Sequence, residues 1–183
     1  MPPSSPSEHS NLGSWIARLR EPDPSASVKD RMDAIDRDAL DNVVGFAAEH
    51  TRRYIATNGA DDGWEGPRPI LILYSAGRRT GQLRRNPLLY FEQESRRYVI
   101  GSKGGAPTQP EWYLNVMAQP NVHVRVMADV YAATARTLAS DERARLWPEL
   151  VARYPMFGEY QAATDREIPI VELIGIVASG TGT

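Results

Sequence analysis

The sequence contains no cysteine, which excludes a disulfide framework, a thiolate zinc site and a cysteine nucleophile. It also lacks any run near the roughly 20 apolar residues that cross a bilayer, and its N-terminus has no basic region followed by an apolar stretch. The net charge of −2 lacks the basic excess typical of nucleic-acid binders. The three histidines, His9, His50 and His123, have no metal-site spacing. We therefore expect a cytoplasmic protein that binds neither metal nor nucleic acid.

The length of 183 residues, with 42% hydrophobic and 24% charged residues, is typical of one globular domain with a tail. Residues 1–27 are rich in Pro and Ser and predict an irregular arm. Within the arm, Trp15, Ile16 and Leu19 have the spacing of a single helical turn. We expect this turn to pack on the domain formed by residues 28–183, and the alternative is a peripheral contact with a membrane or partner.

Residues 28–58 predict one long or broken helix, because their apolar residues recur every three or four positions. Two shorter helices are predicted at 111–119, with Pro110 at or near its start, and at 141–154, with Ser140 as N-cap. Six strands are predicted within 66–176, at 69–74, 85–91, 97–101, 122–126, 130–139 and 168–174. Turn residues between most of them favour an antiparallel order. The fold class is therefore α+β, with a small six-stranded barrel.

Five arginines and no acidic residue occur between Gly66 and Phe91. They are Arg68, Arg78, Arg79, Arg84 and Arg85. Removing these five charges from the net −2 leaves −7 for the rest of the chain, so this segment is a positive island on an acidic body. Such an island favours a local site for an anion.

The segment Ser75-Ala-Gly-Arg-Arg-Thr-Gly-Gln82 lies between two predicted strands. It offers hydroxyls, guanidinium groups and, in a tight glycine turn, unpaired backbone N–H groups, which together suit a phosphate. The alternative is a solvated hairpin loop, since the segment lacks the spacing of a Walker or Rossmann loop.

A second polar segment, Ser102-Lys-Gly-Gly-Ala-Pro107, follows a predicted strand and contains one of only two lysines in the chain. Its adjacent glycines allow the backbone to approach a flat ligand closely. Trp112 and Tyr113 follow on the next predicted helix and provide aromatic faces, although large aromatic side chains also fill protein cores.

Three runs, SAGRRTGQLRRNPLLY, YVIGSKGGAPTQPEWYLNV and RYPMFGEYQAATDREIPIVEL, resemble the deazaflavin-dependent nitroreductase family over about residues 69–173. The resemblance implies an FMN-binding split-barrel-like fold, here a split β-barrel, that uses coenzyme F420 without bound FMN. It implies that reduced 8-hydroxy-5-deazaflavin donates a hydride to a hydrophobic organic acceptor, such as a quinone, a nitro compound or an activated enone.

By the same resemblance, the cofactor-binding residues are Ser75, Gly77, Arg78, Arg79, Thr80, Gly81, Arg84, Asn86, Pro87, Leu88, Ser102, Lys103, Gly104, Gly105 and Trp112. The first seven match the family's phosphate-binding turn and its neighbour, and Asn86 to Leu88 match the strand that lines the deazaflavin. The segment from Ser102 to Gly105 matches the part that wraps the cofactor, and Trp112 matches an aromatic residue near the ring.

The third run places Tyr154, Phe157 and Tyr160 at an interval of three, where the family often has three tyrosines. The resemblance implies that these residues line the acceptor pocket, and Phe157 makes it more apolar. Hydride delivery leaves negative charge on the acceptor, which must be stabilised and protonated. Tyr160 is the candidate proton donor, with Ser102 and Tyr154 as further catalytic candidates, because a phenol holds its proton at neutral pH. The alternative for Tyr160 is a packing role.

Two other functions remain open from the sequence. The first is a protein that binds F420, or another phosphorylated or lipid-like ligand, without turnover, which the missing hydroxyl at Phe157 favours. The second is an FMN-dependent oxidoreductase on the same barrel. In each case the partner is a small molecule, and we expect a monomer or a homodimer.

Overall fold

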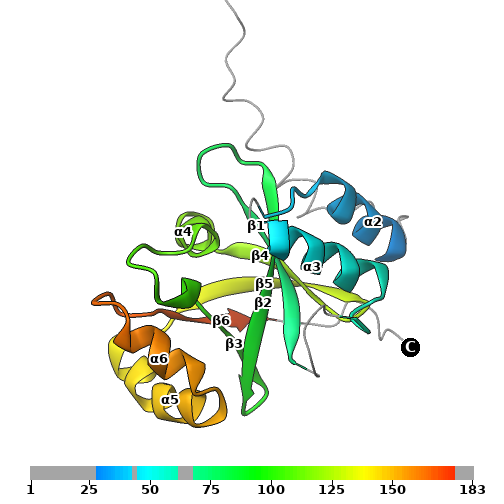
Figure 1. Cartoon of the computed structure of the whole chain (residues 1–183). Coiled ribbons are helices and arrows are strands. Elements are labelled where there is room, and N and C mark those ends of the chain that lie inside the picture. The colour runs from blue at the N-terminus through cyan, green and yellow to red at the C-terminus, as the bar shows by residue number, and fades with distance from the viewer. Residues whose placement is uncertain (1–27, 43–44, 62–67, 176–183) are drawn as a thin grey trace, which may run out of the picture.

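The structure, a computed structural model, describes residues 28–42, 45–61 and 68–175 (Figure 1). Its helices are α2 (Val28–Asp38), α3 (Gly45–Ala56), α4 (Glu111–Ala118), α5 (Ser140–Arg153) and α6 (Met156–Ala162), with a 3-10 turn, η2 (Lys103–Gly105). Its strands are β1 (Ile70–Ala76), β2 (Leu83–Gln93), β3 (Arg96–Ile100), β4 (Asn121–Val126), β5 (Asp129–Thr137) and β6 (Ile170–Ile174). The arm, with its predicted turn and membrane contact near Trp15, lies outside the described residues.

The six strands form one closed barrel in the order β1-β2-β3-β6-β5-β4, and every neighbouring pair is antiparallel. This confirms the predicted α+β class and the six-stranded barrel. Strand β1 closes the barrel by pairing with both β2 and β4, and β6 lies between β3 and β5. No described helix is long and apolar enough to cross a membrane.

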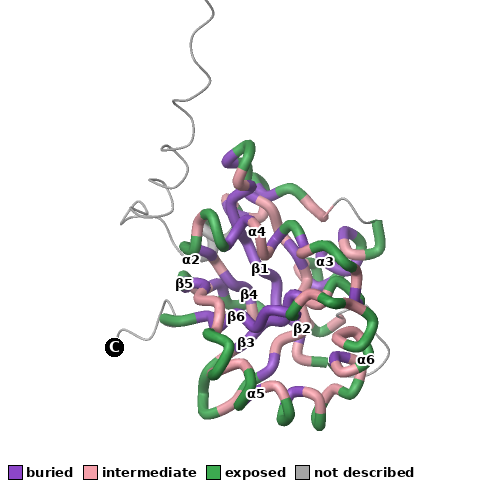
Figure 2. Tube along the Cα trace, turned by 90° about the vertical axis from the view of Figure 1, so that its left-hand side faces the viewer, coloured by how far each residue is buried: buried purple, intermediate pink, exposed green. Residues whose placement is uncertain are grey.

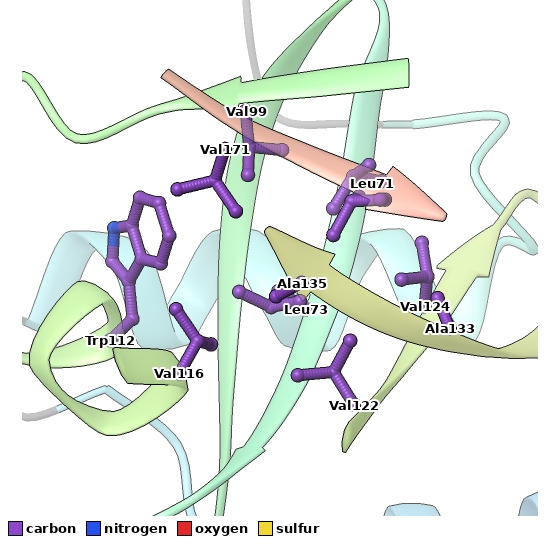
Figure 3. Packing of buried hydrophobic residues seen from close by; sticks show 11 residues of the cluster. Leu71, Leu73, Val99, Trp112, Val116, Val122, Val124, Ala133, Ala135 and Val171 are labelled. Carbon is purple, nitrogen blue, oxygen red and sulfur yellow. The ribbon is translucent and has the colours of Figure 1, made fainter. Parts of the chain in front are cut away.

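Alternation along the strands sends one set of side chains into the barrel and the other outward. Leu71 and Leu73 of β1 belong to the interior cluster, whereas Ile70 and Ile72 belong to an outer one. All seven residues of β1 are buried, because helices cover its outer face (Figure 2). Helix α4 adds Trp112 to the interior cluster, where the indole lies beside valines of the strands (Figure 3).

Two outer clusters attach the remaining helices. Ile35 of α2, Ala39 directly after it and Tyr54 of α3 pack on β1, with Val130 of β5. Helices α5 and α6 pack together on the opposite side of the barrel (Figure 1), and their cluster includes Ile100 of β3. Helix α4 packs on β1 and β5, apart from both helix pairs, and the loop before it lies against α6.

The region predicted as one long or broken helix over 28–58 is broken into α2 and α3, and Leu40 between them bridges to Arg84 of β2. Two other local details differ from what the sequence indicates. Ser140 begins α5 instead of capping it, because Ala139 is the N-cap and its N–H donates to the Glu142 carboxylate over 2.9 Å. Helix α6 was not predicted.

Candidate functional site

The turn between β1 and β2 uses most of its own backbone donors. Gly77 N–H donates to the Gln82 carbonyl over 2.8 Å, and the N–H groups of Thr80 and Gly81 donate to the Gly77 carbonyl. A Cβ at Gly77 would lie 3.0 Å from Thr80 Oγ1, so the turn is closely folded on itself. The expectation of unpaired amides in this turn is therefore wrong, and its polar side chains are what it presents to a ligand.

Arg78 is held by helix α4. Its backbone N–H and its Nη1 both donate to Asn115 Oδ1, over 3.1 and 3.2 Å, and Nη1 also lies 2.6 Å from Glu111 Oε2. Asn115 is buried, whereas the Glu111 side chain is 72% exposed. Arg78 therefore fixes the turn against α4 and reaches a ligand only beside the Glu111 carboxylate.

The positive island is divided between two faces of the barrel. Arg85 points outward and pairs with Asp36 of α2 and with Asp41. Its charge therefore helps to hold α2 and the segment after it against β2. Arg79 is exposed, and it donates no hydrogen bond to a described residue. Arg84 lies beside the turn, since its Nε is 3.8 Å from the position of a Cβ at Gly77. Ser75 is 1% exposed, and its hydroxyl has no partner in the described chain.

The loop between β3 and α4 has a strained backbone. Lys103, Gly104 and Gly105 all have left-handed φ angles, of 48°, 61° and 78°. A left-handed φ is sterically unfavourable for Lys103, which has a Cβ, and not for glycine. Backbone strain of this kind is concentrated at functional sites. Lys103 and Gly104 are exposed residues, and within the described part of the chain their N–H groups donate no hydrogen bond, so this loop has the unpaired amides expected in the other turn. Lys103 Nζ reaches Thr108 Oγ1 over 2.8 Å.

The turn and the loop meet at the start of α4. The pKa of the Glu111 carboxyl is lowered, first by its hydrogen bond to Arg78 and further by the charges of Arg78, Arg79 and Lys103. Because all three cations act on one carboxylate, they form a single positive cluster. We call this group, with the N–H groups of Lys103 and Gly104, the cationic site.

Helix α6 adjoins the same loop. A Cβ at Gly105 would lie 2.8 Å from the backbone oxygen of Tyr160, so the loop touches the backbone of α6 at that residue. Figure 1 shows the loop lying between α4 and α6. The Tyr160 side chain is half-buried and packs edge-on to Phe157, with ring centroids 6.1 Å apart. The backbone of the proposed proton donor therefore lies against the glycine loop.

The predicted site residues differ in how far they are buried. Phe157 is 4% exposed in the apolar cluster beneath α5 and α6, and Trp112 is 7% exposed in the barrel interior. Asn86 is buried and accepts a hydrogen bond from Asn42 over 2.7 Å. Pro87, Leu88, Ser102 and Tyr154 are half-buried. Of the third run, Tyr154 and Tyr160 therefore keep exposed surface.

Arg166 is a residue that sequence reasoning missed. It lies between α6 and β6, and its guanidinium donates four hydrogen bonds to the loop that carries Lys103. No local pattern indicates its partners, because they lie 57 to 65 residues earlier in the chain.

The donor set of the cationic site fits an anionic group of coenzyme F420. Guanidinium, ammonium and backbone N–H groups all donate to phosphate or carboxylate oxygens, and a Cβ at Gly104 would find no atom within 4 Å. Across the described ranges, no three His, Asp or Glu side chains gather in a way that could hold a metal ion.

The profile of the F420H(2)-dependent quinone reductase family matches residues 46–174. The F420H(2)-dependent quinone reductase Rv1261c of Mycobacterium tuberculosis is 33% identical over 128 residues, which cover 68% of this chain and 86% of that protein. A solved F420-H2 dependent reductase, FDR-A, is 38% identical with a TM-score of 0.53, over 61% of this chain and 99% of its own. A second solved chain, described as a domain-swapped dimer, is 36% identical with a TM-score of 0.55, over 68% and 94%.

Proposed function

The chain belongs to the F420H(2)-dependent quinone reductase family, and from this premise we propose that it reduces a small hydrophobic quinone with coenzyme F420. It is an oxidoreductase, and its cofactor is F420 instead of the FMN of the alternative considered above. Nitro compounds and activated enones are further acceptors in this proposal, because each accumulates negative charge when it receives a hydride.

The observation that carries the proposal is the position of the cationic site, which is formed by the β1–β2 turn and the loop before α4 and lies beside helix α6. Arg79 and Lys103 present positive charge, and the neighbouring amides donate to oxygen atoms. In the proposal these groups bind the anionic tail and polar edge of the coenzyme. The glycine loop then brings the bound coenzyme towards Tyr160, whose backbone it touches.

Reduced F420 supplies the hydride when it is bound. A quinone that gains a hydride needs one further proton to become the neutral hydroquinone, and a positioned hydroxyl provides it efficiently. The Tyr160 phenol and the Ser102 hydroxyl make no hydrogen bond to any described residue, so each can turn towards an acceptor. We assign Tyr160 as donor and Ser102 as its partner in stabilising the charged acceptor.

The surface around this donor suits an apolar acceptor. Tyr154 packs edge-on to Phe91 and Phe157, with ring centroids 6.5 and 6.3 Å apart, and it provides an aromatic face near Tyr160. Phe157 itself is buried, so a hydroxyl at that position would point into the apolar core instead of contacting the acceptor. The argument that its missing hydroxyl favours a carrier without turnover therefore fails.

The proposal extends to a homodimer, because a solved relative is described as a domain-swapped dimer. Light scattering during size-exclusion chromatography tests this part.

Titration of the purified protein with oxidised F420, followed by the fluorescence of the ligand, tests the binding step. Reduced F420 is then mixed with the protein and a quinone, a nitroaromatic or an enone, and its oxidation is followed by absorbance. We expect saturable binding and the fastest turnover with the quinone. Binding without turnover of any acceptor would contradict the proposal.

A further inference from the structure

Arg166 joins the start of β6 to the loop before α4. Its Nε donates to the Ala106 carbonyl over 2.8 Å, and its Nη2 donates to the Ser102 carbonyl over 2.6 Å. Its Nη1 donates to the Gly101 carbonyl and to Gln109 Oε1, over 3.0 and 2.9 Å. Four of the five guanidinium N–H groups are thus used on one loop, a geometry that the planar fork of arginine allows and an ammonium group does not.

These four hydrogen bonds connect the two ends of the loop. Gly101 and Ser102 precede the strained turn at Lys103, and Ala106 and Gln109 follow it. A non-glycine residue keeps a left-handed φ only where surrounding contacts over-determine its conformation. Arg166 supplies such contacts on both sides of Lys103 at once.

The charge of Arg166 has no acidic partner. In the described part of the chain, no carboxylate lies within 4 Å of its guanidinium, and its neighbour Glu167 is directed to Arg143 instead. Burial lowers the pKa of Arg166, and no acidic group opposes that effect. Arg166 is only partly buried, but a cation balanced by neutral oxygens alone is less well stabilised than one with an acidic partner, which favours a role for its charge.

We propose that Arg166 is a positioning residue for the coenzyme. It holds the loop from Gly101 to Gln109 so that Lys103 and the N–H groups of Lys103 and Gly104 face the ligand, and it adds unbalanced positive charge behind them. The inference rests on the proposed function, because it concerns the binding of F420 at the same site.

The test compares two substitutions in the full chain with a matched control. Arg166→Gln removes the charge and most of the hydrogen bonds, and Arg166→Lys keeps the charge without the fork. Arg143→Gln is the control, because Arg143 is also half-buried and donates to the Ile168 carbonyl and to Gln161, but makes no contact with the loop. Three quantities are measured: F420 affinity by fluorescence, hydrogen exchange of residues 101–109, and the melting temperature.

We expect Arg166→Gln to weaken F420 binding at least about tenfold, a typical loss for charge-assisted contacts, and to speed exchange in 101–109. Arg166→Lys should restore part of the affinity while exchange stays fast. Arg143→Gln should lower the melting temperature and leave F420 affinity within about twofold, since its side-chain hydrogen bonds go to Ile168 and Gln161 and not to the loop.

Unchanged affinity in a folded Arg166→Gln protein would overturn the inference while leaving the proposed function intact. If that variant does not fold, unchanged affinity and exchange in Arg166→Lys would overturn it equally. An affinity loss in Arg143→Gln as large as in Arg166→Gln would show a general structural effect and also overturn it. Absence of F420 binding by the wild-type protein would instead overturn the proposed function, and the inference with it.

Discussion

Gly105 packs directly against the backbone of Tyr160, and a Cβ added to the glycine would lie 2.8 Å from the Tyr160 carbonyl oxygen. Gly104, one residue earlier, has open space at the same position, although both residues have left-handed φ angles. The two glycines therefore separate two requirements of the loop. One concerns packing on α6, and the other concerns approach of a ligand.

We expect Gly105→Ala to lower the free energy of unfolding by at least about 2 kcal/mol, because the methyl group meets backbone as well as an unfavourable φ. Gly104→Ala should cost only about 1 kcal/mol, from its φ angle, yet it should weaken F420 binding at the exposed loop. Urea unfolding and F420 titration of both variants measure this. Equal loss of stability in the two proteins would contradict the packing argument.

The arginines of the turn should behave differently from each other. Arg79 is exposed and makes no hydrogen bond within the described chain, so Arg79→Ala should leave stability within about 0.5 kcal/mol. F420 affinity should fall about tenfold, or about 1.4 kcal/mol, and the remaining affinity should depend less on salt. Arg78→Ala should reduce both stability and affinity, since Arg78 also binds α4. Unchanged affinity in Arg79→Ala would contradict its assignment to the cationic site.

Glu111 places a negative charge within the cationic site. We expect Glu111→Gln to tighten F420 binding several-fold, because the substitution removes repulsion of an anionic ligand and releases Arg78 from its ion pair. Glu49→Gln on α3 changes the net charge equally and serves as the control. Titrations at low and at physiological salt measure the effect. Weaker binding in Glu111→Gln would show that the carboxylate orients Arg78 for the ligand instead of competing with it.

Tyr160→Phe tests the proton donor. The ring and its edge contact with Phe157 remain, so F420 affinity should persist, whereas turnover with quinone should fall by about 10² to 10⁴. Single-turnover kinetics with prebound reduced F420 measure the chemical step. Full activity in Tyr160→Phe would show that the Tyr160 hydroxyl is not the proton donor. Ser102 would then be the remaining candidate of the pair.

A pH effect is expected at the start of α5. The pKa of Glu142 is lowered to about 2, first by its hydrogen bonds to Arg136 and then by the Ala139 N–H. Because the folded pKa lies below the ordinary value of 4.5, the stabilisation is present above about pH 4.5 and is lost as pH falls towards 2. Wild type should therefore melt higher than Glu142→Gln at pH 6, with the difference vanishing near pH 2. A difference independent of pH would contradict this assignment.

The strands could be predicted from the sequence because each carries its own local pattern. The run from Ile70 to Tyr74 is continuously apolar, since β1 is covered on both faces, and β3 and β4 are short runs rich in valine, isoleucine or tyrosine. Helix α6 could not be predicted in the same way. It spans seven residues, begins after Pro155 and contains Gly158, so it lacks both length and propensity.

The site could be predicted only in part for a similar reason. Residue types indicate an anion site, but the roles of the arginines depend on which face of the barrel each occupies. Arg85 and Arg84 are neighbours in sequence, and alternation sends Arg85 outward to Asp36 while Arg84 stays beside the turn. The contacts of Arg166 arise from tertiary structure alone, and no spacing in the sequence indicates them.

The position of β6 between β3 and β5 affects folding of the chain during its synthesis as well as the stability of the finished barrel. Synthesis proceeds from the N-terminus, so the first five strands emerge while their last partner is still missing. They can form only an open sheet, in which β3 and β5 are unpaired edges and the interior is accessible to other chains. Nascent or prematurely terminated polypeptides should therefore be the aggregation-prone form of this protein, and addition of residues 170–174 removes both edges in one step.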